Sequence, residues 1–145
     1  MRYDSIPALP VLPDGVEIRI VAGHTHYAID TLARVWSCKE QGRWFHIVDW
    51  RQMKVCVKTD YPRVTLYLNS KIKPSNVHVL MLTTFVGPAP KGYVCRHLDG
   101  NRLNNLLSNI CWGTRAENEA AKVLHGRSNH GERNGTKTKP WSRPR

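Results

Sequence analysis

The stretch from Tyr93 to Leu124 reads YVCRHLDGNRLNNLLSNICWGTRAENEAAKVL. Tyr93–His97 alternates and is rich in β-forming residues, which predicts a strand. Asp99-Gly100-Asn101 has turn chemistry, and the two asparagines that follow extend the loop. Ile110–Trp112 is short and apolar and suits a half-buried returning strand.

A helix is predicted directly after this second strand. Thr114 and Glu117 form a capping-box pattern, in which the hydroxyl accepts from the Glu117 amide and the carboxylate reaches back. Ala116–Leu124 contains good helix formers, and Gly126 is placed to end the helix. The whole stretch therefore predicts a β-hairpin with a helix laid across it.

Three polar residues occupy defined places on this scaffold. His97 ends the first strand, Asn109 starts the second, and Asn118 lies in the first turn of the helix. The text RHLDGNRLNNLLSNICWGTRAENEA resembles the HNH nucleases, the ββα-metal group, and most closely the homing endonucleases of phages and introns. The resemblance is specific because the turn, the Trp112-Gly113-Thr114 exit and all three spacings agree together.

Phosphodiester hydrolysis needs a base for water and a cation for the charge on the leaving oxygen. An imidazole changes protonation state close to neutral pH, so His97 is the candidate catalytic base. Asn118 offers a hard amide oxygen, and the resemblance assigns it to the metal, Mg²⁺ or another divalent cation such as Mn²⁺. Asn109 resembles the middle Asn of the motif, which brackets the two strands and holds the His loop in place.

The residue before His97 departs from the family pattern. Many homing members carry Asp there as a second metal ligand, whereas this chain has Arg96, which does not bind a cation. Three alternatives stay open: the metal relies on Asn118, phosphate oxygens and water; Asp99 helps to hold it; or the site is weakened. Arg96 is also a candidate phosphate clamp.

The charge of the chain points to a polyanionic partner. Its 145 residues include 22 Lys and Arg against 11 Asp and Glu, a net charge of +11, which favours a nucleic acid as the partner. The resemblance to the homing endonucleases implies that this partner is double-stranded DNA. No apolar run long enough to span a membrane and no basic amphipathic helix occurs. The proline-containing start MRYDSIPALPVLP argues against a signal peptide, so we expect a cytoplasmic protein.

The four cysteines, Cys38, Cys56, Cys95 and Cys111, are scattered, and none forms a C-x-x-C pair. A structural zinc is therefore not expected. Cys95 and Cys111 fall in the two predicted hairpin strands and are candidate cross-strand neighbours, expected as thiols in a reducing cytosol.

The residues before the hairpin read mainly as strands. Val16–Val21 alternates and predicts a strand. Tyr27–Trp36 passes for a short helix by composition, but it resembles the opening of a NUMOD-type segment, which is a strand, a tight turn and a strand, with Ala33 where Gly is usual. Further strands are predicted at Trp44–Trp50, Val55–Lys58 and Arg63–Leu68, and a basic turn at Lys71–Ser75.

Asn76–Gly87 resembles the helix that backs the hairpin in the same families. Its apolar residues, Leu80, Met81, Leu82 and Phe85, are expected to pack beneath the hairpin. We interpret His78 as a capping or packing histidine at the helix start rather than a catalytic group.

The tail after Gly126 is basic and rich in Gly, Ser, Asn, Thr and Pro, a composition that buries little apolar surface. We expect it to be a flexible arm that orders on DNA, with a solubilising tail as the alternative. The helix-turn-helix that follows in longer homing enzymes is not predicted in Thr136–Arg145. The candidate nucleic-acid-binding residues along the core and tail are Arg96, Arg102, Arg115, Lys122, Arg127 and Arg133.

These patterns predict an α+β protein in which an antiparallel N-terminal β lobe (1–75) packs on a ββα-metal core (76–126), followed by a basic tail (127–145). The function implied is a metal-dependent DNA endonuclease of the HNH homing type that nicks one strand as a monomer; its oligomeric state is left open. The alternatives are a non-catalytic nucleic-acid-binding protein on a degenerate scaffold and, more remotely, an RNA-acting protein.

Overall fold

The computed structural model describes residues 2–3, 5–39, 46–68 and 71–126. An antiparallel five-stranded sheet lies at the N-terminal end, with the strand order β1-β5-β4-β3-β2. Its strands are β1 (Arg2–Tyr3), β2 (Ile18–Val21), β3 (His24–Asp30), β4 (Val35–Lys39) and β5 (Ile47–Gln52). The predicted strands at Val16–Val21 and Trp44–Trp50 correspond to β2 and β5, although residues 44–45 lie outside the described residues.

The turn between β3 and β4 is the tight turn predicted for Tyr27–Trp36, and the helical alternative was wrong. Fully buried Asp30 organises it, since Oδ1 accepts from the amides of Leu32 at 2.9 Å and Arg34 at 3.1 Å. Oδ2 accepts from Arg34 Nε at 2.7 Å and Trp36 Nε1 at 3.0 Å. Ala33 adopts a left-handed φ of 63°, the conformation that favours Gly at this position.

A separate hairpin follows the sheet. β6 (Arg63–Leu68) pairs along its whole length with β7 (Lys71–Asn76). The strand predicted at Arg63–Leu68 is confirmed, but the basic turn predicted at Lys71–Ser75 is in fact strand β7, because pairing with β6 overrides the local turn signal of Pro74. The strand predicted at Val55–Lys58 was also wrong, since this segment has only the isolated bridge between Cys56 and Arg63.

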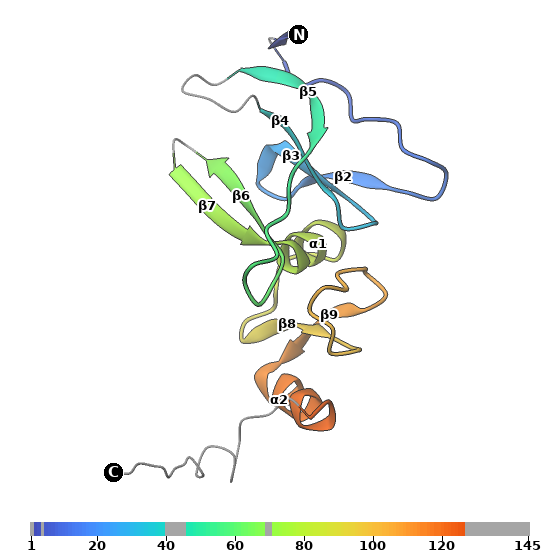
Figure 1. The fold of residues 1–145 in the computed structure, drawn as a ribbon, viewed down its shortest axis with the longest axis vertical. Coiled ribbons are helices and arrows are strands. Elements are labelled where there is room, and N and C mark those ends of the chain that lie inside the picture. Colours follow the sequence, from blue (N-terminus) through green and yellow to red (C-terminus); the bar gives the residue numbers. More distant parts are fainter. Residues whose placement is uncertain (1, 4, 40–45, 69–70, 127–145) are drawn as a thin grey trace.

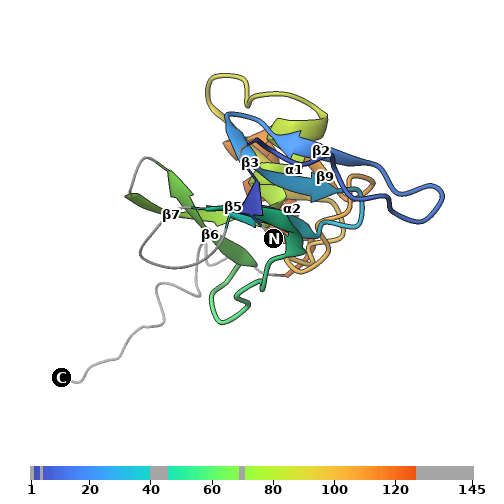
Figure 2. The ribbon, with the colours of Figure 1, turned by 90° about the horizontal axis from the view of Figure 1, so that it is seen from above.

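Helix α1 (Val77–Phe85) connects the sheet, this hairpin and the C-terminal part of the chain. It follows β7 without a linker and lies between the five-stranded sheet and β8–β9 (Figure 1). Its Met81 and Leu82 are fully buried in one cluster with Ile29 of β3, Leu66 of β6 and Ile110 of β9. A view at right angles shows the β6–β7 hairpin reaching out to one side of α1 (Figure 2).

The C-terminal part is a hairpin and a helix, as predicted. β8 (Tyr93–His97) pairs antiparallel with β9 (Ile110–Thr114), and α2 (Arg115–Leu124) follows directly. Trp112 Nε1 donates to the carbonyl of Gly87 at 3.0 Å, which ties the hairpin to the end of α1. Both bonds of the predicted capping box are present at Thr114.

The two hairpin cysteines are not paired directly. Cys95 lies opposite Trp112 and Cys111 opposite Arg96, so the two cysteines lie on adjacent strands, as expected, but one register position apart. Both are free thiols. Burial raises the pKa of Cys95 to about 12, which keeps its thiol protonated at neutral pH.

Within the described ranges, no helix has the length and apolar character needed to cross a membrane.

Candidate active site

A shallow hollow, open to solvent, lies where β8, the loop after it and α2 meet. His97 at the end of β8 and Asn118 in the first turn of α2 both line it, although they are far apart in the chain. The other residues around it are Tyr61, Cys95, Gly100, Arg102, Ala121, Lys122 and His125. An imidazole and a carboxamide side chain therefore line the same open space.

Asn109 holds the loop that follows His97. Its Oδ1 accepts from the amide of Asp99 at 3.0 Å, and its Nδ2 donates to Asp99 Oδ1 at 2.8 Å and to the carbonyl of Asn104 at 2.9 Å. Its carbonyl accepts from the amide of Leu98 at 2.8 Å. The side chain is buried and is not part of the wall of the hollow, so it braces the loop instead of facing a ligand.

The His97 ring lies in a polar and aromatic setting. Its Nε2 is 2.8 Å from Oδ1 of Asn105. The ring of His78, from α1, meets it edge-on with centroids 5.1 Å apart, and the ring of Tyr61 lies roughly parallel to it at 6.0 Å. Burial, and then the neighbouring His97, lowers the pKa of His78 to about 4, so His78 is neutral at physiological pH.

Asp99 was predicted as a possible metal ligand, and its carboxylate is engaged within the loop. Oδ1 accepts from the Asn101 amide at 2.7 Å as well as from Asn109, and Oδ2 accepts from Asn104 Nδ2 at 2.9 Å. The bonds from Asn104 and Asn101 lower the pKa of this carboxyl and keep it ionised. Asp99 is not among the residues that line the hollow, and a metal role for it stays a prediction.

Arg96 lies against the first turn of α2. Its Nη1 is 3.7 Å from Glu117 Oε2, and its Nε is buried without a hydrogen-bond partner. A Cβ on Gly113 would stand 2.2 Å from Arg96 Cδ, so the absence of a side chain at residue 113 is what lets the arginine stem pass. The predicted phosphate clamp would therefore require this guanidinium to leave Glu117.

Two of the predicted DNA-binding cations belong to the hollow. Arg102 lies 3.4 Å from Asp60 Oδ1 and has its guanidinium 5.1 Å from the centre of the Tyr61 ring, and Lys122 Nζ lies 2.8 Å from Glu119 Oε1. Arg115 is exposed at the start of α2 but does not line the hollow. The other two predicted residues, Arg127 and Arg133, lie outside the described residues.

The donor set suits a weakly held cation. The described part of the chain has no group of three or more His, Cys, Asp or Glu side chains placed to hold a metal ion. The wall of the hollow contains an amide oxygen and imidazoles but no carboxylate. Such a set fits a hard divalent ion that keeps most of its waters and takes its anionic ligands from a nucleic-acid phosphate.

Comparison with known proteins identifies the class of this domain. The family described as HNH_3, HNH endonuclease, matches residues 75–120, which span α1, the β8–β9 hairpin and the start of α2. The chain therefore contains an HNH endonuclease domain, as the resemblance of Arg96–Ala120 predicts. The match does not reach Tyr27–Trp36, so the NUMOD-type resemblance stays a prediction.

The relatives are homing and viral nucleases. DNA endonuclease I-HmuI of Bacillus phage SP01 is 30% identical over 104 residues, covering 72% of this chain and 55% of that protein. The uncharacterized HNH endonuclease L245 of Acanthamoeba polyphaga mimivirus is 33% identical over 74 residues, covering 51% of this chain and 22% of that protein. The chain thus spans well under two thirds of these curated relatives.

A solved structure that describes DNA binding and cleavage by the HNH homing endonuclease I-HmuI matches with a TM-score of 0.65 and 28% identity. The matched region covers 79% of this chain and 62% of the I-HmuI chain in that structure. The chain is therefore homologous to I-HmuI and has its α+β HNH fold.

Sequence reasoning missed part of the neighbourhood of His97. Asn105 was interpreted only as loop, Tyr61 was assigned no role, and His78 was set aside as a packing residue. A buried contact between His97 and a residue eight positions later depends on the path of the loop, which local turn propensities do not specify. The repeated asparagines at 104 and 105 were the available signal, because adjacent amides in a loop often bond within it.

Proposed function

We propose that this chain is an HNH-type DNA endonuclease that hydrolyses phosphodiester bonds of double-stranded DNA with the help of a divalent cation. One observation carries the proposal: His97 and Asn118 line the same solvent-open hollow. The HNH family match and the homology to an enzyme that cleaves DNA support it.

In the proposed reaction, His97 accepts a proton from a water molecule as the water oxygen bonds to phosphorus. The bond from phosphorus to the 3′ oxygen breaks, which leaves 5′-phosphate and 3′-hydroxyl ends. A bound Mg²⁺ or Mn²⁺, held by Asn118, would supply positive charge for the leaving oxygen. Asn109 keeps the loop after His97 in place, and Arg102 and Lys122 offer positive charge to the DNA at the rim of the hollow.

The parts of the chain have separate tasks in this proposal. Residues 76–126 carry the cleavage site, residues 1–75 position the duplex, and the basic residues 127–145 contribute further phosphate contacts. One His97 serves one phosphodiester bond, so a monomer is expected to nick a single strand.

The test is cleavage of supercoiled plasmid. We expect the wild-type protein to convert it to open circles with Mg²⁺ and to do nothing with EDTA. His97→Ala is expected to reduce the rate at least about 100-fold, the contribution typical of a general base. His46→Ala, a histidine that does not line the hollow, is the matched control and should nick normally. Equal rates for His97→Ala and wild type would contradict the proposal.

A second candidate is a nucleic-acid-binding protein that has kept the scaffold without catalysis. The observations that favour it are the hollow without a carboxylate and Arg96 in place of the usual Asp. Salt-sensitive DNA binding without any nicking that depends on Mg²⁺ or Mn²⁺ would establish this candidate. Preferential retention of folded RNA over duplex DNA at matched salt would instead support the RNA-acting alternative.

A further inference from the structure

His97 makes one hydrogen bond through its ring, and that bond determines which nitrogen carries the proton. Its Nε2 lies 2.8 Å from Oδ1 of Asn105. A carboxamide oxygen only accepts hydrogen bonds, so with this oxygen facing the ring we infer that Nε2 carries the proton of the neutral imidazole. In the described part of the chain, no group is bonded to Nδ1, so the lone pair of Nδ1 is left available.

Asn105 is itself held in a defined place. Only 5% of its surface is exposed, which is low for a loop asparagine. The preceding residue is fixed on three sides, because the Asn104 amide donates to the carbonyl of Asn101, its Nδ2 donates to Asp99, and its carbonyl accepts from Asn109. The loop that Asn109 braces therefore presents the Asn105 oxygen to the imidazole.

The ring of His97 is restricted on its other sides by aromatic contacts. His78 meets it edge-on and Tyr61 lies roughly parallel to it. These contacts limit ring rotation but do not distinguish the two nitrogens, because neither neighbour forms a hydrogen bond with the His97 ring. Among the described residues, Asn105 alone supplies that distinction.

We propose that Asn105 is the positioning residue of the HNH site, and that it fixes His97 as the Nε2–H tautomer so that Nδ1 is the nitrogen that takes the proton from water. This inference rests on the proposed nuclease function and specifies the state of its base. The water proton goes to Nδ1, the water oxygen bonds to phosphorus, and the departing 3′ oxygen is protonated from solvent.

The first test measures the tautomer directly in the free protein. The full chain, labelled with ¹⁵N histidine, is studied by long-range ¹H–¹⁵N correlation at about pH 8, where an ordinary imidazole is neutral. The resonances of His97 are assigned from their loss in His97→Gln. We expect Nδ1 at the chemical shift of an unprotonated ring nitrogen and Nε2 at that of a protonated one. A wild-type spectrum with the proton on Nδ1 overturns the inference.

Variants then separate positioning from loop folding. Asn105→Ala should give averaged shifts from a mixture of tautomers, whereas Asn105→Asp, which keeps an acceptor oxygen, should keep the wild-type pattern. Asn76→Ala is the matched control, since Asn76 accepts from Arg63 outside this loop and does not bond to the ring. An unchanged tautomer in Asn105→Ala, or the same averaging in Asn76→Ala, contradicts the inference. If Asn105→Ala does not fold, the wild-type and Asn105→Asp spectra decide.

The kinetic test uses nicking of a duplex oligonucleotide. Asn105→Ala should lower kcat by up to about 100-fold with KM for DNA unchanged, because a misplaced base affects the chemical step and not binding. Asn105→Asp should recover most of kcat. If Asn105→Ala instead raises KM and leaves kcat unchanged, the positioning role is contradicted. If the wild-type protein does not nick DNA, the proposed function fails, while the tautomer measurement still decides the role of Asn105.

Discussion

At the scale of single residues, His78 is a buried titratable group that makes stability depend on pH. Its folded-state pKa is about 4 against 6.5 for an ordinary histidine. Between these values the unfolded chain binds a proton and the folded protein does not, so stability falls as the pH is lowered from 6.5 to 4 and is fully retained above 6.5. The expected loss from this group is about 3 kcal/mol.

Urea unfolding across this pH range tests the prediction. The wild-type free energy of unfolding should fall steadily below pH 6.5, and His78→Phe should remove most of this slope. His46→Phe, at a histidine outside the His78–His97–Tyr61 cluster, is the control and should keep the wild-type slope. Equal slopes in wild type and His78→Phe would show that another group causes the acid sensitivity.

The sequence predicted the motif residues of the candidate site, but it did not predict the residues that contact His97. His97, Asn109 and Asn118 were predicted because their spacing repeats a known motif, and the structure brings His97 and Asn118 to one hollow. Asn105 and Tyr61 were not assigned, because their positions depend on loop paths and on packing between distant segments.

At the scale of elements, α2 depends on its N-terminal cap, and Asn118 depends on α2. Thr114 Oγ1 accepts from the Glu117 amide at 3.2 Å, and Glu117 Oε2 accepts from the Thr114 amide at 2.7 Å. None of the residues of α2 is fully buried, so local bonds matter more here than in α1. We expect Thr114→Ala to destabilise the protein by about 1 kcal/mol.

The same substitution should slow nicking, because fraying of the first turn displaces Asn118. Thermal melting and plasmid nicking measure the two effects. Thr114→Ser keeps the accepting hydroxyl and is the control, expected to retain both stability and rate. Normal melting of Thr114→Ala would mean that the cap contributes nothing to stability.

The turn between β3 and β4 carries a residue that does not favour its conformation. Ala33 adopts a φ of 63°, which costs an L-residue with a side chain about 1–2 kcal/mol. Ala33→Gly relieves this strain but adds about 0.4–1 kcal/mol of freedom to the unfolded chain. We therefore expect a net gain of about 0.5 kcal/mol in the free energy of unfolding.

Thermal or urea unfolding measures this gain, and Ala28→Gly is the control. Ala28 lies fully buried within β3, where Gly weakens a strand, so that variant should be less stable than wild type. A loss of stability in Ala33→Gly comparable to that in Ala28→Gly would contradict the strain argument.

The elements that sequence predicted well are those whose signals are local. Arg63–Leu68 alternates, and Thr114 with Glu117 forms a complete cap, so β6 and the start of α2 were predicted correctly. Lys71–Ser75 became strand β7 through pairing with β6, and Val55–Lys58 lacked a full partner strand. Both errors arise because strand formation depends on a distant partner.

At the scale of the whole molecule, the parts that the sequence suggested as separate lobes share one apolar cluster. Ile29 of the sheet, Leu66 of the hairpin and Ile110 of the HNH domain all belong to this cluster together with α1 residues. The cluster residues of the sheet and of the β6–β7 hairpin are thus fixed relative to the HNH domain, which suits a task in positioning DNA. The boundary at residue 75 stays a prediction about function.

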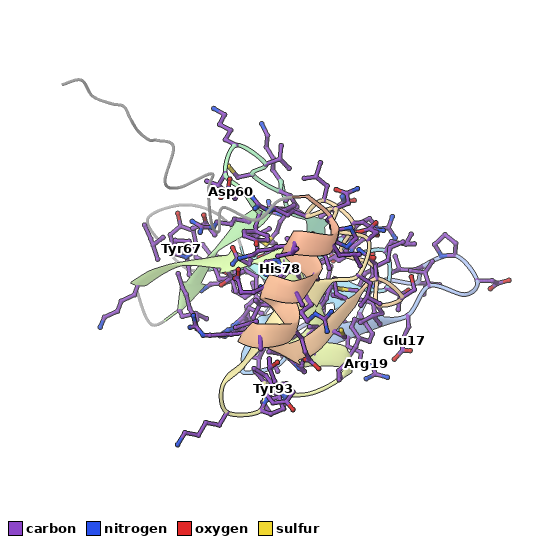
Figure 3. The ribbon with its side chains drawn as sticks, turned by 90° about the horizontal axis from the view of Figure 1, so that it is seen from below. Glu17, Arg19, Asp60, Tyr67, His78 and Tyr93 are labelled. Atoms are coloured by element: carbon purple, nitrogen blue, oxygen red, sulfur yellow. The ribbon has the colours of Figure 1, made fainter. Side chains whose placement is uncertain are left out.

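The last prediction concerns where DNA lies on this molecule. Arg102 and Lys122 line the hollow, and Arg102 is paired with Asp60. Arg19 is paired with Glu17 and lies over Phe85, and Figure 3 places it on the opposite side of the molecule from Asp60. If DNA crosses the hollow, Arg102 and Lys122 contact phosphates and Arg19 does not.

Salt dependence of duplex binding separates these cations. The slope of log K against log salt falls by about 0.9 for each phosphate that the protein no longer neutralises. We therefore expect the double variant Arg102→Gln, Lys122→Gln to reduce the slope by about 2 and Arg19→Gln to leave it unchanged. Binding is measured by fluorescence anisotropy from about 50 to 200 mM salt, with EDTA to prevent cleavage. An equal reduction of the slope in Arg19→Gln would contradict this placement of the duplex. It would mean that DNA binding depends on the positive charge of the whole surface and not on the cations at the hollow.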